Sequence, residues 1–295
     1  MEITAAAVKE LRERSGAGMM ECKKALVQNQ GDMEASIDWL RTQGLAKADK
    51  KASRVAAEGR FAVALGDNEA VVVEVNCETD FVAKDANFVA FADAVAAAAL
   101  NAHSRDVEVI KAQSLGEETV EQRRQALVAK IGENLQIRRA SYAKAANLGV
   151  YLHSNARIAV LVNMQGGTAE LAKSVAMHIA AMTPLYLDME QVPADVFERE
   201  KQIALEQSKD SGKPAEILEK MVLGKIRKQL GDQTLVGQAF AAADADGKTV
   251  GEALKKAGAT VLSFTRLSVG EGIEKKQEDF AAEVMAQVAA SQLKS

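Results

Sequence analysis

Apolar positions recur with the period of an α-helix through the beginning of the chain. The pattern predicts three short helices, with Gly16 ending the first and Gly44 ending the third. We expect their apolar positions to form one small core, made of Val8, Leu11, Cys22, Ala25, Leu26, Met33, Ile37 and Leu40. The basic stretch 47–54 has few core residues and is typical of a linker. Residues 1–55 are therefore predicted to be a three-helix N-terminal domain with a basic tether.

The middle of the chain changes to strand-like runs, and it does so twice. Residues 59–76 form two β-rich runs around a Gly-Asp-Asn turn, and a helix begins near Asp85. Residues 148–165 repeat this plan around a Ser-Asn turn. Each unit closes with a helix end, a glycine and a strand, in ALVAKIGENLQIRR and ALKKAGATVLSFTR. The expected fold class is α+β, with two related core subdomains of antiparallel strands at 56–141 and 142–269.

Two more helical segments complete the predicted organisation. Residues from about 193 to 230 have sparse apolar positions among charges, and Pro214 is suited to the start of a returning helix. This pattern predicts a projecting helical hairpin inserted in the second subdomain. The tail, 270–295, carries an apolar helical stripe and is predicted to be a C-terminal helical module. Its stripe consists of Phe280, Val284 and Val288.

Composition and charge favour a protein-binding protein over a nucleic-acid binder. The 295 residues are 48% hydrophobic and 26% charged, with a formal net charge of −4 and a pI near 5.6. Binding dominated by phosphate contacts normally needs a basic excess, so we expect no direct nucleic-acid partner. Cys22 and Cys77 lie far apart, which fits reduced thiols. With neither a signal peptide nor an apolar run of membrane-spanning length, the chain is expected to be cytoplasmic with no membrane partner.

The motifs that could carry chemistry are weak. The DGKT stretch ending at Thr249 has Ala242 where a phosphate-binding loop needs glycine, so a helix cap explains it better. The three histidines, His103, His153 and His178, have no metal-ligand spacing. We expect His178 to be a packed helix residue and His153 to occupy an exposed hairpin turn. The sequence thus predicts neither an active site, nor a metal, nor a cofactor.

The loop TDFV, between a predicted strand and the helix at Asp85, poses a sharper question. Phe81 could fold back as an anchor for this loop, and general burial tendencies favour that reading. However, a hydrophobic staple would use the position of Lys84, and Val82 could do the packing alone. The alternative is a ring offered to a partner's pocket beside the carboxylate of Asp80. The residues themselves leave both alternatives open.

Five stretches of the chain share one resemblance. They are TDFVAKDANFVAF, VKELRERSGAGMMECKKAL, VGEGIEK, AKIGENLQIRR and ARIAVLV. The first is similar to the signature of one family, that of bacterial elongation factor Ts, the nucleotide exchange factor for elongation factor Tu. The second resembles the family's N-terminal motif and the third its C-terminal motif. The last two also match, so the resemblance covers essentially the whole chain.

The resemblance implies a set of partner-binding residues. In the family, the loop matching Thr79, Asp80, Phe81 and Val82 dislodges Mg²⁺ from elongation factor Tu. The ring wedges between two helices of the GTPase domain, and the carboxylate acts beside it. Secondary contacts are expected from the residues matching Lys23, Ile131, Gly132 and His153.

The resemblance also implies which states of the partner are bound and how the protein acts. Elongation factor Tu would be bound in its GDP-bound and nucleotide-free forms. GDP release would be promoted by binding, not by bond chemistry. A UBA-like N-terminal domain and the C-terminal module would dock as well.

Two other classes remain as alternatives. One is a scaffold without exchange activity, in which the three-helix domain joins an oligomerisation module. The other is a nucleotide-hydrolysing enzyme, which the weak phosphate-loop match disfavours. The sequence leaves the oligomeric state open, including a homodimer or a two-to-two complex with the partner.

Overall fold

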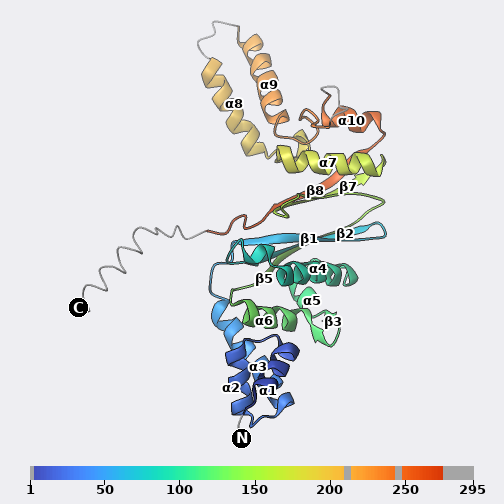
Figure 1. Ribbon diagram of the computed structural model, residues 1–295. Helices are drawn as coiled ribbons and strands as arrows, with labels where there is room; N and C mark the ends of the chain where they lie inside the picture. The colour runs from blue at the N-terminus through green and yellow to red at the C-terminus, as the bar shows by residue number, and fades with distance from the viewer. Residues whose placement is uncertain (1–2, 209–213, 243–247, 275–295) are drawn as a thin grey trace, which may run out of the picture.

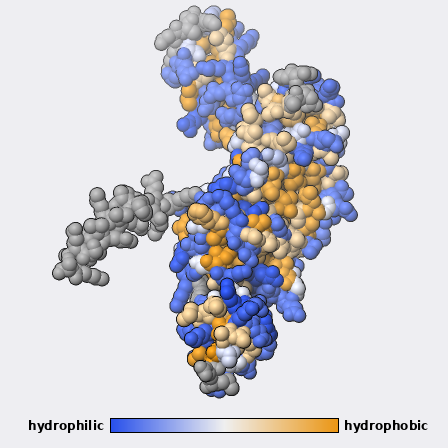
Figure 2. Space-filling view, viewed as in Figure 1, coloured by the Kyte–Doolittle hydropathy of each residue, from blue (hydrophilic) through white to orange (hydrophobic). Residues whose placement is uncertain are grey.

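The computed structural model describes residues 3–208, 214–242 and 248–274. A three-helix unit lies at one end, two sheets with covering helices fill the middle, and a helical hairpin projects at the other end (Figure 1). The hairpin surface is largely hydrophilic in the view of Figure 2. No helix of the described segments is long and apolar enough to cross a membrane.

The N-terminal unit has the predicted core. Thr4 caps the first helix by accepting a hydrogen bond from Ala7 N–H, and Gly16 ends it in the left-handed conformation. The apolar positions predicted to be buried pack together. The helices are α1 (Ala5–Ser15), α2 (Met19–Gln28) and α3 (Met33–Lys51).

The prediction that α3 ends at Gly44 is wrong, because the helix continues to Lys51 through much of the expected linker. Gly44 is buried, and a Cβ at its position would lie 3.5 Å from Cβ of Ala129 in α6 (Val120–Ile131). A helix interior tolerates glycine at a cost of about 1 kcal/mol. This distance is an ordinary van der Waals contact, so the junction of α3 and α6 also has room for the methyl group of alanine.

The first core unit is an antiparallel sheet covered by helices. Asp85 accepts hydrogen bonds from Asn87 and Phe88 N–H and caps α4, as predicted. Helix α4 packs on the sheet and α6 packs on α4, and all of them share one continuous core. In the order β1-β2-β5, the strands are β1 (Glu58–Gly66), β2 (Glu69–Cys77) and β5 (Gln136–Lys144). The remaining elements are α4 (Ala86–Asn101), α5 (Val107–Lys111), β3 (Ser114–Leu115) and β4 (Glu118–Thr119).

The second core unit repeats this plan, which confirms the predicted pair of related subdomains. Thr249 caps α10 with a reciprocal capping box, the role predicted for it in place of a phosphate loop. The sheet order is β6-β7-β8, again antiparallel. The strands are β6 (Asn147–Leu152), β7 (Ile158–Gln165) and β8 (Thr260–Ser268), and the helices are α7 (Ala169–Met182) and α10 (Val250–Lys256).

The two units differ in the connection from the middle strand to the covering helix. In the second unit residues 166–168 suffice to join β7 to α7. In the first unit residues 78–85 join β2 to α4 and include a short 3₁₀ helix, η1 (Val82–Lys84). The TDFV stretch lies in this longer connection.

The two sheets pack face to face, with α4 outside one and α7 outside the other (Figure 1). The residues buried between them are Phe61, Ala70, Val72, Ala159 and Leu161. Since each sheet is apolar on both faces, the units form one layered body.

The projecting hairpin is present as predicted. Its arms are α8 (Ala194–Ser208) and α9 (Ala215–Gly231), after a 3₁₀ turn η2 (Met189–Gln191). Pro214 is the N-cap of α9. Residues 211–213, which directly precede Pro214, and the helix predicted in the C-terminal module, which falls on 275–295, lie outside the described residues. The buried positions between the arms are Ala204, Val222, Ile226 and Leu230.

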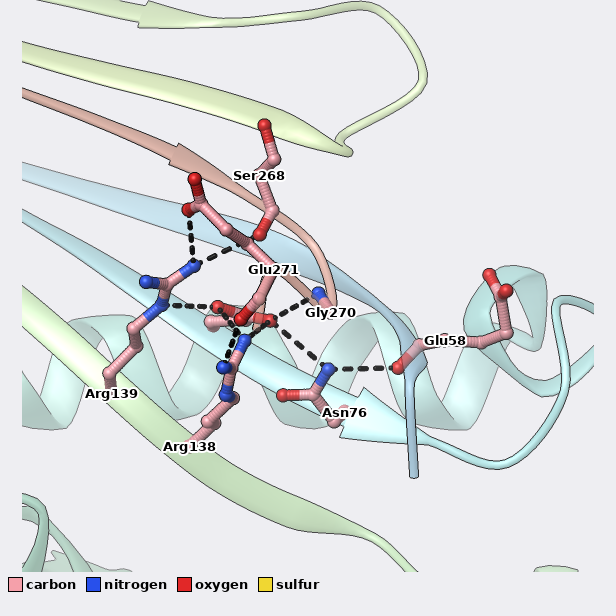
Figure 3. A network of polar contacts seen from close by, with 8 residues as sticks. Glu58, Asn76, Arg138, Arg139, Ser268, Gly270 and Glu271 are labelled. Atoms are coloured by element: carbon pink, nitrogen blue, oxygen red, sulfur yellow. Dashed lines mark hydrogen bonds and ion pairs between the residues drawn. The ribbon is translucent and has the colours of Figure 1, made fainter. Parts of the chain in front are cut away.

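A buried charged network joins the segment after β8 to the first sheet (Figure 3). Glu74 on β2 is fully buried and accepts hydrogen bonds from Arg138, Arg139 and the backbone N–H of Gly270. The β2–β5 register shifts here, so that Arg138 is the extra residue of a bulge. A bulge re-aims side chains, which explains how two consecutive residues of one strand reach the same carboxylate.

Candidate functional site

Phe81 points away from the protein. Its side chain is 82% exposed, so the interpretation of Phe81 as an inward anchor is wrong. Val82 and Ala83 pack against the core of the first sheet instead. An exposed ring of this size is unusual for a soluble surface, and a rigid loop that presents one is typical of a binding surface.

The base of this loop is held by a carboxylate from a distant part of the chain. Glu133, which follows α6, accepts hydrogen bonds from the backbone N–H groups of Glu78 and Thr79, both at 3.0 Å. Its second oxygen accepts a bond from the Thr79 hydroxyl at 2.7 Å. The hydroxyl in turn accepts the N–H of Val82 at 3.3 Å. These bonds fix the backbone just before and just after Phe81.

The turn that carries Glu133 is itself well defined. Gly132 ends α6 in the left-handed conformation, with φ 90°. The N–H of Asn134 donates to the carboxylate of Glu78 at 2.6 Å, so the loop and the turn hold each other reciprocally. Lys51 at the end of α3 donates to the carbonyl of Gly132. One turn therefore contacts both the loop and the N-terminal unit.

Asp80 lies beside Phe81 and is exposed. Its carboxylate pairs with Lys84 at 2.7 Å, one helical turn later. The hydrogen bond from Lys84 lowers the pKa of Asp80 below its ordinary value, and the charge of Arg157 adds to the effect. The carboxylate is therefore ionised at neutral pH and available to a partner that displaces Lys84.

The structure places three of the four predicted secondary residues near this loop. Ile131 and Gly132 are half-buried and directly precede Glu133. His153 lies in the β6–β7 turn, whose Arg157 forms an ion pair with Glu58. Glu58 is opposite Cys77 in the sheet register, so this turn approaches the point where the loop leaves β2.

The expectation that His153 is exposed is wrong. The residue is half-buried, and its Nδ1 lies 2.9 Å from the hydroxyl of Tyr151. The turn is pulled toward the first sheet, because the N–H of Phe61 donates to the carbonyl of Ala156 at 2.8 Å. Tertiary contacts thus override the exposure that its place in a hairpin turn predicts.

Lys23 lies on the N-terminal unit. It is exposed on α2, between the exposed apolar residues Met20 and Val27. Within the described segments, no hydrogen bond or ion pair joins Lys23 to the loop. A partner would have to span both surfaces to contact them together.

The arrangement offers surfaces for binding and little for bond chemistry. Among the described residues, no group of three or more His, Cys, Asp and Glu could hold a metal ion. Burial raises the pKa of the Cys77 thiol to about 12, so it is not a nucleophile at neutral pH. His178 is packed as predicted, with Nε2 3.0 Å from the side-chain oxygen of Gln238. Sequence reasoning missed Glu133, because nothing in the local pattern links it to Thr79, 54 residues away.

Comparisons with known proteins agree with this description. The model of a family described as elongation factor TS matches residues 78–271, which include the TDFV loop, β5 of the first sheet and the whole of the second sheet. Elongation factor Ts of Xanthomonas campestris pv. campestris (strain B100) is 57% identical over 291 residues, which is 97% of this chain and 99% of that protein. Elongation factor Ts of Thioalkalivibrio sulfidiphilus (strain HL-EbGR7) is 56% identical over 292 residues, with the same coverage. The chain therefore belongs to the elongation factor Ts family.

Proposed function

We propose that this chain binds elongation factor Tu, in its GDP-bound and nucleotide-free forms, and accelerates the exchange of GDP for GTP. Membership of the elongation factor Ts family supports the exchange role. The single observation that carries the mechanism is the outward ring of Phe81 on a braced loop. A translation factor of this kind acts by binding and needs no catalytic group of its own.

Phe81 is proposed to enter an apolar pocket between two helices of the GTPase domain. Aromatic side chains that fill such pockets contribute much of the binding energy of an interface. Thr79 and Val82 keep the loop in shape, and Asp80 faces the phosphate and Mg²⁺ site from beside the ring. Lys23, Ile131, Gly132 and His153 are proposed to make secondary contacts around this centre.

The coupling between the two sites explains how binding releases nucleotide. GDP with Mg²⁺ and this protein favour different arrangements of the same phosphate site, so each weakens the binding of the other. A thousandfold acceleration of GDP release needs a barrier lower by about 4 kcal/mol. An aromatic anchor supplies about 2 kcal/mol or more of this. Loss of Mg²⁺, the largest local charge opposing the phosphates, is proposed to supply much of the rest.

The direct test is the release of fluorescent GDP from elongation factor Tu in the presence of Phe81→Ala. We expect the stimulation to fall about 30-fold, the equivalent of about 2 kcal/mol. Leu65→Ala is the matched control, because Leu65 is also an exposed apolar residue (66%) but lies at the opposite end of β1 and β2. Equal release rates with the wild-type protein and Phe81→Ala would refute the wedge mechanism.

A further inference from the structure

A residue outside the TDFV loop controls its shape. We propose that Glu133 is a positioning residue for exchange: its carboxylate holds the loop so that Phe81 projects before the partner arrives. This inference rests on the proposed function, since it assigns a role in presenting the same ring. Glu133 itself need not touch the partner.

The number and arrangement of the hydrogen bonds to Glu133 indicate that its carboxylate holds the loop in place. Both oxygens of Glu133 are used, one by the N–H groups of Glu78 and Thr79 and the other by the Thr79 hydroxyl. That hydroxyl donates to Glu133 and accepts from Val82, so its orientation is defined. Hydrogen bonds to a charged acceptor are stronger than those between neutral groups.

The turn that carries Glu133 is also held in place, by hydrogen bonds to the end of α3 and the residues that follow it. The side chain of Asn134 donates to the carbonyl of Arg54 at 2.7 Å, and its backbone N–H donates to Glu78. Lys51 bonds the carbonyl of Gly132. The carboxylate is therefore presented from a turn that is fixed by the N-terminal unit, and it cannot simply follow a moving loop.

The hydrogen bonds from Glu133 matter because water does not stabilise an exposed phenylalanine ring in its outward position. An unrestrained loop would lose conformational entropy on binding, or would let Phe81 collapse onto nearby apolar surface. Holding the backbone on both sides of the ring in advance reduces this loss, which is the general benefit of preorganisation. The bonds from Glu133 meet that requirement for Phe81.

The first test uses the free protein and needs no partner. In Glu133→Ala, amide hydrogen exchange at Glu78, Thr79 and Val82 should become at least tenfold faster. The N–H groups of Glu78 and Thr79 lose their acceptor, and the N–H of Val82 donates to a Thr79 hydroxyl that Glu133 no longer orients. Glu121→Ala is the matched control. Glu121 is a half-buried carboxylate at the other end of α6 that also accepts several bonds, from Arg124 and Gln125. Unchanged amide protection at the loop in Glu133→Ala would overturn the proposal.

The second test is a double-mutant cycle in the GDP release assay. Glu133→Ala should lower the stimulation about tenfold in the wild-type background and have little effect in Phe81→Ala, since the brace acts through the ring. Equal effects in the two backgrounds would indicate a general structural role and overturn the proposal. Glu121→Ala should leave the stimulation unchanged.

A conservative variant guards against misfolding. Glu133→Gln retains one oxygen for the two backbone donors but places an NH₂ group before the Thr79 hydroxyl, so its stimulation should lie between those of wild type and Glu133→Ala. If Phe81→Ala loses stimulation while both Glu133 variants behave as wild type, this inference alone fails. If Phe81→Ala also behaves as wild type, the proposed function fails with it.

Discussion

Replacing Glu74 by alanine should lower the free energy of unfolding by about 3 kcal/mol, far more than removing a surface carboxylate. Glu74 is fully buried and receives Arg139 Nε at 2.6 Å, Gly270 N–H at 2.8 Å, and both Arg138 Nη1 and Asn76 Nδ2 at 3.1 Å. The substitution leaves two guanidinium groups and a backbone N–H without this acceptor (Figure 3). Removing one partner of a buried ion pair typically costs about 3–5 kcal/mol.

The exposure of the arginines sets the value at the lower end of that range. Their side chains are 23% exposed for Arg138 and 30% for Arg139, so water can partly replace the lost carboxylate. The backbone N–H of Gly270 is less able than the arginine side chains to move toward another acceptor. A Cβ on this glycine would lie 2.3 Å from the carbonyl oxygen of Ala57, so its backbone is tightly placed. An unsatisfied buried donor alone costs about 1–3 kcal/mol, and this cost is part of the expected total of about 3 kcal/mol.

Thermal unfolding followed by circular dichroism measures the effect. At about 2–4 °C per kcal/mol for a protein of this size class, the expected fall in Tm is about 6–12 °C. Glu271→Ala is the control, because Glu271 pairs with the same Arg139 but is 54% exposed, and its loss should cost less than about 1 kcal/mol. If Glu74→Ala lowered the Tm as little as Glu271→Ala does, the stabilising role of the buried Glu74 carboxylate would be refuted.

The same network should be visible in the pH dependence of stability. Burial alone would raise the pKa of Glu74, but the hydrogen bonds from Gly270 and Arg139 outweigh it and hold the pKa below its ordinary value of 4.5. A lowered pKa in the folded state means that this stabilisation is present above pH 4.5 and is lost as the pH falls through the folded-state pKa. The Tm difference between wild type and Glu74→Gln should therefore shrink on acidification below pH 4.5. A difference that stays constant would contradict the assignment.

Two further substitutions test local features of the structure. Gly44→Ala should raise stability by about 0.5–1 kcal/mol, because the new Cβ meets Ala129 at an ordinary 3.5 Å and alanine favours the helix; a lower Tm would contradict the packing described for α3. Lys84→Ala should raise the pKa of Asp80 toward its ordinary value, since the hydrogen bond from Lys84 is the largest cause of its depression. An NMR titration of the Asp80 carboxyl carbon measures this, and an unchanged pKa would show that the pair is absent in solution.

Local patterns were sufficient to predict the repeated sheet-and-helix plan. Runs of β-rich residues around short turns predict the strands, and Asp85, a capping residue before an apolar helical stripe, predicts the start of α4. The prediction at Gly44 fails because a glycine stop needs a left-handed backbone, whereas Gly44 keeps a helical backbone where α3 packs on α6. Only the tertiary structure contains that information.

The details of the candidate site were less accessible from the sequence. The direction of Phe81 depends on Val82 and Ala83, which satisfy the core and leave the ring outside. The brace from Glu133 and the convergence of Arg138 and Arg139 depend on a distant turn and on a bulge. Neither leaves a periodic signal, because hydrophobic patterning reports burial and not the pairing of polar groups.

The two connections between middle strand and covering helix have a consequence for how such a protein can evolve. Residues 166–168 show that three residues are enough to connect the middle strand to its covering helix. Residues 78–85 make the same connection in the first unit and also present the TDFV loop. Because the entropic cost of a longer loop grows only with the logarithm of its length, extra residues here place little burden on the layers beneath. In a fold with two such units, the connection at 78–85 can therefore acquire a binding role while the connection at 166–168 remains a short link between strand and helix.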